Sequence, residues 1–260
     1  MITMKGAAVS AKLKEQVEKG LETLTWVPKL TIIRVGENPD DISYEKGATK
    51  KLTSFGLEVE SKVFPGDISD EAFKKEFAAI NADASVDGIL MLRPLPKQIN
   101  EQDIEKMIDP AKDLDGISPV NIAKVFSGDT SGFAPCTAEA VVCMLKMNDI
   151  ALSGKRVAVV GRSMVVGRPL SMLLLHENAT VTICHSRTAS LPEVCREADI
   201  LTACVGKAAM INHTYVKKDA VVIDVGINID ENGKLCGDVD FADLEGTASV
   251  SYTHLTLPTI

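Results

Sequence analysis

Apolar residues in the first half of the chain alternate between a helical and an extended spacing. Five early apolar positions share the 3.6-residue period of a helix face: Val9, Leu13, Val17, Leu21 and Leu24. Short apolar runs predict buried strands, and periodic segments between them predict helices, with strands at 30–35, 57–64 and 88–92 and helices at 41–55 and 70–80. This alternation predicts an α/β fold, a parallel sheet with helices on both faces.

A proline-containing loop, RPLPKQ at 93–98, leaves the last of these strands. Open α/β sheets place ligands beside the carboxyl ends of their strands, so this loop is a candidate for ligand contact. Residues 109–136 contain several Asp, Gly and Pro residues and are predicted to be mostly loop. A helix is expected from Thr137 to about Asn148, and the boundary between two domains is expected in this helix region.

The second half contains a strand, a glycine turn, a helix and another strand within residues 154–188. The apolar run 157–160 stops at Gly161, Gly167 opens an amphipathic segment, and a second apolar run covers 180–184. This order is half of a dinucleotide-binding unit, because glycines let the backbone approach a pyrophosphate and the helix start attracts its charge. The Gly-x5-Gly spacing fits the usual GxGxxG pattern only loosely, so an ordinary strand-to-helix turn is the alternative.

Residues around this turn indicate which dinucleotide it would hold. Arg162 and Ser163 lie in the turn, within reach of a phosphate. The second strand ends without the Asp or Glu that binds the ribose 2′-hydroxyl of NAD, and Arg187 near that end suits the 2′-phosphate of NADP. His185 is interpreted as a packing residue at the strand end. A helix at 191–197, strands at 200–205 and 220–225 and a glycine turn at 226–228 complete the Rossmann-type pattern.

Composition narrows the class of protein. The net charge of −8 argues against nonspecific nucleic-acid binding but allows a local basic cluster for an anionic small molecule. No apolar stretch is long enough for a membrane span, and the first residues lack a signal-peptide pattern. The six cysteines form no CxxC pair, which predicts reduced, buried thiols in a cytoplasmic protein and no metal site.

Nine segments together resemble the methylenetetrahydrofolate dehydrogenase/cyclohydrolase family. They are VGENPDDISY, GILMLRPLPKQI, KDLDGISPVN, FAPCTAEA, GRSMVVGRP, TVTICHSRT, ADILTACVGKAAMI, VVIDVGIN and GDVDF, and the match covers roughly residues 5–250. The resemblance implies a folate-binding catalytic domain at 1–138 and an NADP-binding Rossmann domain at 139–250, with the folate in the cleft between them. It also implies oxidation of 5,10-methylenetetrahydrofolate to the methenyl form, hydrolysis of that product in bifunctional members, and, in bacteria, a cytoplasmic homodimer.

The resemblance assigns roles to individual residues. Tyr44 matches the tyrosine that stacks beside the folate, although a half-buried helix tyrosine is the alternative. Asp115 matches the carboxylate that accepts hydrogen bonds from the pterin, although an aspartate before glycine is often only a turn former. The positions expected to contact NADP are Gly161, Arg162, Ser163, Gly167, Ser186, Arg187 and Ile227.

Two positions depart from the family pattern where proton transfer is needed. Bifunctional members carry a catalytic lysine four residues after the tyrosine, where this chain has Ala48. The glutamine that bonds that lysine is replaced by Leu92, and Arg93 beside it is a poor proton acceptor. Lys50 is the candidate substitute, with Lys46 as a second. A solvated helix face is the preferred interpretation of both lysines.

These departures predict unequal effects on the two reactions. Hydride loss from the methylene bridge is driven by the folate nitrogen and requires mainly positioning, whereas hydrolysis needs an acid–base group that contributes about 10²–10⁴-fold. Dehydrogenase activity is therefore expected, with weak or absent cyclohydrolase activity. The alternatives are a bifunctional enzyme that uses Lys50 or Lys46, a nucleotide-binding protein without catalysis, and a different Rossmann dehydrogenase acting on shikimate or amino acids.

The last ten residues form a third departure. Family members continue with a proline/glycine loop and a helix that returns to the first domain, whereas this chain reads SYTHLTLPTI at 251–260. These residues are interpreted as a non-native tail, with a divergent natural terminus as the alternative. Lower stability and reduced activity are expected from the missing loop and helix, and restoring them should raise the melting temperature.

Overall fold

The computed structural model describes residues 2–4, 6–231, 233–247 and 250–252. The chain divides into two compact units. Of the described residues, those from Ala11 to Cys136 form the N-terminal unit, and those up to Ser10 together with those from Thr137 to Tyr252 form the C-terminal unit. Helix α1 (Gly6–Leu21) begins in residues of the C-terminal unit and continues in the N-terminal unit. Of the predicted tail at 251–260, only Ser251 and Tyr252 are among the described residues.

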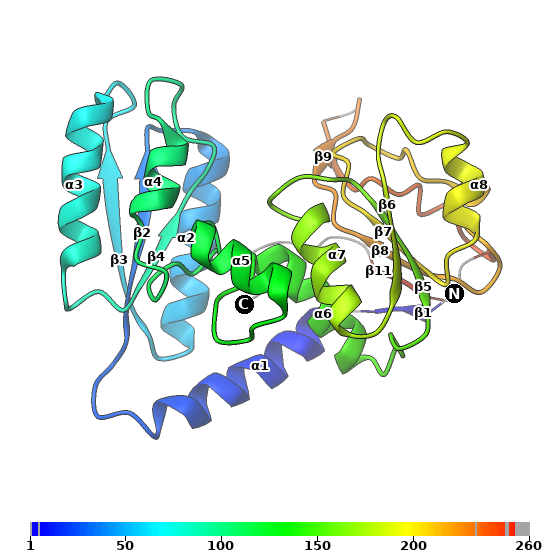
Figure 1. The fold of residues 1–260 in the computed structure, drawn as a ribbon, viewed down its shortest axis with the longest axis horizontal. Coiled ribbons are helices and arrows are strands. Elements are labelled where there is room, and N and C mark those ends of the chain that lie inside the picture. The colour runs from blue at the N-terminus through cyan, green and yellow to red at the C-terminus, as the bar shows by residue number, and fades with distance from the viewer. Residues whose placement is uncertain (1, 5, 232, 248–249, 253–260) are drawn as a thin grey trace. The chain divides into compact units, whose positions relative to one another are not determined.

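The N-terminal unit is built on a three-stranded parallel sheet in the order β3-β2-β4 (Figure 1). The strands are β2 (Lys29–Val35), β3 (Glu58–Phe64) and β4 (Gly88–Met91). The helices that follow α1 in this unit are α2 (Pro39–Ser54), α3 (Asp70–Ala82), α4 (Glu101–Met107) and α5 (Pro119–Ser127). The strands and the helices α2 and α3 confirm the alternation that the apolar pattern predicts.

Successive residues of β2 point to opposite faces of this sheet, as the period of a strand requires. Ile33 packs in a cluster with Phe73 and Phe77 of α3. Its neighbour Ile32 packs on the other face in a second cluster, which contains Ala48 of α2. Tyr44 packs against the edge of this second cluster. The fold therefore places the two positions that depart from the family pattern, Ala48 and Leu92, in one apolar cluster.

Residues 109–136 are loop-rich, as predicted, but they also contain helix α5, which was not predicted. Ser118 is its N-cap, and the Ser118 hydroxyl accepts a hydrogen bond from the backbone N–H of Asn121 at 3.1 Å. Pro119 occupies the first turn, and Gly128 ends the helix in a left-handed conformation with φ of 78°. A Ser-Pro start and a glycine stop are sequence signals of a helix, so the aspartates and glycines around them concealed a predictable element.

The C-terminal unit is built on a six-stranded parallel sheet in the order β1-β11-β8-β7-β5-β6. Its strands are β1 (Ile2–Thr3), β5 (Arg156–Val160), β6 (Thr180–Cys184), β7 (Ile200–Ala203), β8 (Val221–Asp224) and β11 (Val250–Tyr252). Its helices are α6 (Cys136–Met147), α7 (Gly167–His176), α8 (Leu191–Arg196) and a 3₁₀ turn at His213–Tyr215, with α6 starting at the last residue of the other unit. The short antiparallel pair β9 (Asn228–Ile229) and β10 (Leu235–Cys236) was not predicted.

Strand β5 pairs with β6 on one side and with β7 on the other, so the strand order reverses at β5. Ligands of doubly wound sheets bind at such a reversal, outside the carboxyl ends of the strands. The two sheets confirm the predicted fold class of two α/β units, one with a Rossmann-type parallel sheet. No helix among the described residues is long and apolar enough to cross a membrane.

The cysteines only partly follow the expectation of buried thiols. All six are free thiols. Cys184 and Cys195 are buried in the core of the C-terminal unit, whereas the other four are only partly buried. Apolar neighbours in the sequence therefore overestimate the burial of some cysteines, such as Cys136 at the start of α6 and Cys143 within it.

Candidate functional site

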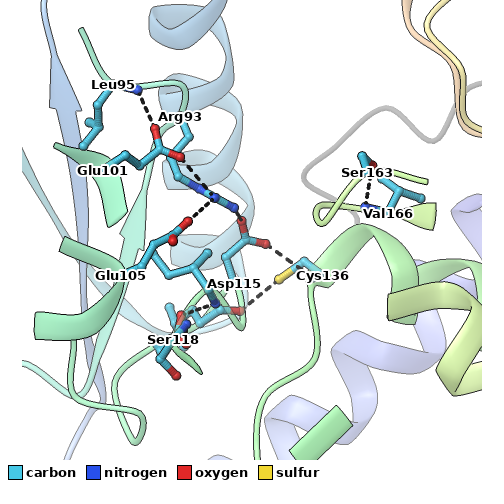
Figure 2. Close-up of polar contacts among 12 residues, drawn as sticks. Arg93, Leu95, Glu101, Glu105, Asp115, Ser118, Cys136, Ser163 and Val166 are labelled. Atoms are coloured by element: carbon cyan, nitrogen blue, oxygen red, sulfur yellow. Dashed lines mark hydrogen bonds and ion pairs between the residues drawn. The ribbon is translucent and has the colours of Figure 1, made fainter. Parts of the chain in front are cut away.

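Arg93 lies at the centre of a charged cluster in the N-terminal unit (Figure 2). It follows strand β4, and its side chain is 16% exposed. Its Nη1 lies 3.4 Å from Glu101 Oε1 and 3.5 Å from Glu105 Oε1, and its Nη2 lies 3.4 Å from Asp115 Oδ2. The second oxygen of Glu101 accepts a hydrogen bond from the backbone N–H of Leu95 at 3.0 Å. The position of the guanidinium is therefore fixed by carboxylates of α4, one of which is bonded in turn to the loop after β4.

Two aspartates of the KDLDG segment have different surroundings. Asp113 is fully buried and accepts hydrogen bonds from the backbone N–H groups of Ile117 and Ser118 at 3.0 and 2.8 Å and from Asn121 Nδ2 at 2.9 Å. Asp115 is half-buried, and beyond Arg93 it accepts one long hydrogen bond, 3.4 Å from the backbone N–H of Cys136 to Oδ1. Asp113 therefore shapes the loop, whereas Asp115 retains capacity to accept hydrogen bonds.

The electrostatics of Asp115 follow from its position. Burial raises the pKa of this carboxyl, while the charge of Arg93 and the hydrogen bonds from Cys136 and Arg93 act in the opposite direction. Burial also raises the pKa of Tyr44, and the nearby Cys136 and Asp115 raise it further. Tyr44 therefore keeps its proton and lies within electrostatic range of Asp115. Of the three predicted catalytic residues, Tyr44, Lys50 and Asp115, the structure thus places Tyr44 and Asp115 within electrostatic range of each other.

The third candidate, Lys50, lies on an exposed part of α2, as does Lys46. Ala48 between them is fully buried and packs with Ile32 and Leu92. The position that carries the catalytic lysine in bifunctional members is thus part of an apolar cluster in this chain. Exposure of both lysines agrees with the solvated helix face preferred from the sequence.

The turn between β5 and α7 depends on two glycines. Gly161 has φ of +140°, and a Cβ at this position would lie 2.4 Å from the carbonyl oxygen of Cys204 on the neighbouring loop. A Cβ at Gly167 would lie 2.3 Å from the carbonyl oxygen of Gly161. Ser163 closes the turn, because its hydroxyl accepts a hydrogen bond from the backbone N–H of Val166 at 3.1 Å (Figure 2). Arg162 is exposed at the tip.

The other residues expected at the cofactor follow neighbouring strands of the same sheet. Ser186 and Arg187 come after β6 and are exposed, and Ile227 comes after β8 with 52% exposure. Because all these strands are parallel, the residues lie along one edge of the sheet with the glycine turn. His185 also shapes this edge, since its Nδ1 accepts a hydrogen bond from the backbone N–H of Arg187 at 3.1 Å. This local hydrogen bond leaves the prediction of a packing residue at the strand end untested.

A pair of buried aspartates, Asp224 and Asp238, joins two loops at this edge and was missed in the sequence. Asp238 accepts hydrogen bonds from the backbone N–H groups of residues 205, 206 and 207 at 2.6, 3.1 and 2.8 Å and from Asn228 Nδ2 at 2.9 Å. Asp224 accepts them from the backbone N–H groups of Gly226, Asp238 and Val239 at 3.0, 2.9 and 3.0 Å. Both side chains are fully buried. The loops after β7 and β8 are thereby fixed to each other.

These residues fit a dinucleotide. The turn presents backbone without side chains at Gly161 and Gly167, and no side-chain cap covers the start of α7 at Val166. Arg162 and Arg187 supply positive charge for phosphates, and β6 ends without an acidic residue. A Rossmann-type unit combined with an α/β unit that carries a partly satisfied carboxylate fits the class of dinucleotide-dependent dehydrogenases.

Comparison with known proteins identifies the family within this class. Residues 4–115 match the model of the tetrahydrofolate dehydrogenase/cyclohydrolase catalytic domain, and residues 135–253 match that of the NAD(P)-binding domain. The bifunctional protein FolD of Clostridium kluyveri is 50% identical over 242 residues, which are 92% of this chain and 85% of that protein. The chain belongs to the tetrahydrofolate dehydrogenase/cyclohydrolase family.

Solved structures agree with this assignment. The bifunctional FolD dehydrogenase/cyclohydrolase of Campylobacter jejuni superposes with a TM-score of 0.93 at 34% identity, covering 100% of this chain and 92% of that one. The Trypanosoma brucei enzyme, solved with NADP and an inhibitor, superposes with a TM-score of 0.89 at 28% identity, covering 96% and 89%. The cofactor of this chain is NADP, in agreement with Arg187 and the absence of an acidic residue at the end of β6.

Proposed function

We propose that this chain oxidises 5,10-methylenetetrahydrofolate to 5,10-methenyltetrahydrofolate with NADP. The observation that carries the proposal is the half-buried Asp115, which keeps free acceptor capacity beside the protonated Tyr44. A carboxylate in this state suits paired N–H donors on a planar ring. Membership of the family supports this reaction. The Clostridium kluyveri relative is named as a bifunctional protein, and the Campylobacter jejuni enzyme is named as a bifunctional dehydrogenase/cyclohydrolase.

The N-terminal unit would hold the folate in this proposal. Asp115 would accept hydrogen bonds from the amino and ring N–H groups of the pterin, and the ring of Tyr44 would pack beside it. Neither residue needs to transfer a proton in the oxidation. The carbon–hydrogen bond of the methylene bridge breaks with its electron pair, and a nitrogen lone pair of the folate forms the new carbon–nitrogen π bond.

The C-terminal unit would hold NADP, which accepts the hydride. The bare backbone at Gly161 and Gly167 and the side chains of Arg162 and Ser163 would contact the phosphates. Ser186 and Arg187 would contact the 2′-phosphate, and Ile227 would present an apolar surface at the same edge. These residues position the cofactor and take no part in covalent chemistry.

The hydrolytic reaction is proposed to be weak or absent, although the relatives named above are bifunctional. Water addition and opening of the methenyl bridge require proton transfer. At the position where such a group would stand, the buried Ala48 packs against Leu92 and Ile32, and none of these side chains can carry a proton. Hydrolysis that depends on Lys50 is the competing proposal, and its side chain is exposed.

One assay tests both parts. The purified protein is given methylenetetrahydrofolate with NADP or NAD, and NADPH or NADH and methenyltetrahydrofolate are followed separately by absorbance. Equal accumulation of NADPH and the methenyl product supports a dehydrogenase without hydrolysis. NADPH without accumulation of the methenyl product, beyond its spontaneous loss, contradicts the hydrolytic part. Absence of NADPH contradicts the proposed function.

Restoring the family pair tests the reason for weak hydrolysis. The double variant Ala48→Lys/Leu92→Gln should gain hydrolysis by about 10²–10⁴-fold, because it adds the acid–base group and its partner. The matched control, Ala48→Met, adds similar volume without a proton-transfer group and should gain nothing. Melting curves of both variants report whether the larger side chain is accommodated. A folded double variant that does not hydrolyse methenyltetrahydrofolate would contradict this explanation.

We further propose that the protein is a cytoplasmic homodimer, as the family resemblance implies. Sedimentation velocity of the purified protein tests the oligomeric state, with a mass near twice that of one chain expected. Cell fractionation of the source organism tests the location. A monomer at high protein concentration would contradict the first part, and recovery in the membrane fraction would contradict the second.

A further inference from the structure

Arg93 is the only cation within ion-pair distance of Asp115 among the described residues, and it reaches that carboxylate from another segment of the chain. It follows β4, whereas Asp115 lies in the KDLDG loop. The guanidinium is planar and always protonated, so it holds a fixed positive charge at this place. Its other terminal nitrogen, Nη1, is oriented by Glu101 and Glu105 of α4.

The charge balance around this guanidinium is negative. Three carboxylates, those of Glu101, Glu105 and Asp115, lie 3.4 to 3.5 Å from one cation. Burial raises the pKa of Glu105, and Arg93 opposes this shift, while Glu101 and Asp113 increase it. Without Arg93, the charges of these carboxylates would disfavour one another and favour the uptake of a proton.

The acceptor capacity of Asp115 remains partly free in spite of Arg93. An ionised carboxylate has about four acceptor positions. Asp115 uses one oxygen for Arg93 and the other for the backbone N–H of Cys136, each at 3.4 Å. These long contacts fix the direction of the carboxylate and leave acceptor positions on both oxygens for a ligand. Protonation would convert one of the oxygens to a donor and remove this complementarity.

We propose that Arg93 is a positioning residue that keeps Asp115 ionised and oriented toward paired N–H donors of the substrate ring. The inference rests on the proposed function, because it assigns Asp115 to the pterin. It differs from that function in concerning a residue that need not touch the substrate. Arg93 acts on substrate affinity through Asp115, and Glu101 and Glu105 in turn hold the guanidinium in place.

The sign of the pH dependence follows from the groups that face Asp115. These are Arg93 after β4, Asp113 of the same loop, Tyr44 of α2 and Cys136 of α6. Glu101 and Glu105 of α4 lie on the other side of the same guanidinium. Among them only Arg93 favours the ionised form by its charge. Substrate affinity should therefore fall as the pH falls through the pKa of Asp115, and removal of Arg93 should move this fall to higher pH.

The test compares Arg93→Gln with Arg93→Lys, which keeps the charge. KM for methylenetetrahydrofolate and kcat are measured from acidic to neutral pH, and calorimetry measures binding of tetrahydrofolate without NADP. Arg93→Gln should raise KM by about tenfold at neutral pH, with kcat within about threefold. The fall in substrate affinity on the acidic side of the pH profile, called the acidic limb below, should move to higher pH. Arg93→Lys should keep the limb near that of the unmodified protein. Lys74→Gln is the matched control, since Lys74 is shared by Asp70 and Asp103 and has no ion pair with Asp115.

Glu105→Gln gives an independent result if Arg93→Gln fails to fold. Glu105 shares the charge of Arg93 with Asp115, and Glu101 still holds the guanidinium when Glu105 is replaced. The variant should therefore move the fall in affinity in the opposite direction, to lower pH. An unmoved limb in Arg93→Gln, or equal losses in the Gln and Lys variants, would overturn the inference and leave the proposed function intact. An unmodified protein that binds tetrahydrofolate but forms no NADPH would refute the proposed function, while the pH shift in binding still tests Arg93. Absence of folate binding would refute both.

Discussion

Each unit contains a carboxylate that connects separate segments: Asp115 in the N-terminal unit and Asp238 in the C-terminal unit. They differ in how many of their acceptor positions are used by hydrogen bonds within the protein. Asp238 is fully buried and accepts four hydrogen bonds of 2.6 to 3.1 Å, three of them from successive backbone N–H groups. Asp115 is half-buried and has two contacts, both at 3.4 Å. Both lie beside a glycine in the sequence, so local sequence does not distinguish them.

The difference separates a structural carboxylate from one that is available to a ligand. All the acceptor positions of Asp238 are used inside the protein, and they hold the loops after β7 and β8 at the edge expected to bind NADP. Asp115 is held in direction but keeps free acceptor positions. In the first unit the site is formed by charged side chains, and in the second it is formed mainly by backbone that buried aspartates hold in place.

The largest effect is expected for Asp238→Ala. The substitution leaves three backbone N–H groups and the amide of Asn228 without their partner, which should lower the stability of the C-terminal unit by about 3–5 kcal/mol. Thermal and urea unfolding measure the loss. The control is Asp240→Asn, because Asp240 is only partly buried. Unchanged stability in Asp238→Ala would contradict the structural role.

Asp115→Asn should have the opposite profile, with activity lost and stability kept. Two charge-assisted hydrogen bonds to the pterin should be weakened, so kcat/KM for methylenetetrahydrofolate should fall by about 100-fold. Burial raises the pKa of Asp115, which means that the folded state favours its neutral form. The destabilisation of the ionised form is therefore absent below the unfolded pKa and fully present above the folded pKa.

The uncharged amide in Asp115→Asn avoids that cost, so the melting temperature at neutral pH should stay equal or rise. Melting curves at neutral and at acidic pH measure the difference, which should shrink as the pH falls. A large loss of stability would mean that Asp115, like Asp238, is a structural residue. A normal kcat/KM would remove it from the site.

The sequence predicts those features of the two units that depend on residues close together in the chain. The strand, turn and helix around Gly161 and Gly167 follow from the local residue pattern, whereas the close approach of Cys204 to Gly161 does not. Family resemblance predicts a role for Asp115. The partners of Arg93 and Asp238 were not predictable in this way, because these contacts join segments 8 to 33 residues apart. Helix α5 was predictable from Ser118 and Gly128 but was concealed by a loop-rich composition.

A smaller effect is expected at the glycine turn itself. Gly161→Ala places a Cβ 2.4 Å from the carbonyl oxygen of Cys204 and strains a backbone with φ of +140°, which should cost about 1–3 kcal/mol. If this cost is lost from the free energy of binding, calorimetry should show roughly tenfold weaker NADP binding. Gly154→Ala is the matched control, since Gly154 also has a positive φ, +73°, but no atom within 4 Å of the added Cβ. Equal NADP affinity in the two variants would show that the close approach is unimportant.

The smallest effect is expected for Lys50→Ala, although Lys50 is the candidate substitute for the missing lysine. Its side chain is exposed on α2, so the substitution should change stability by less than about 0.5 kcal/mol. NADPH formation should also be unchanged, because the oxidation needs no proton acceptor from this helix. Any residual hydrolysis of methenyltetrahydrofolate should equal that of Lys46→Ala, which removes the other exposed lysine beside Ala48. A loss of hydrolysis in Lys50→Ala alone would show that this lysine reaches the substrate, and the apolar cluster at Ala48 would then not be what limits the second reaction.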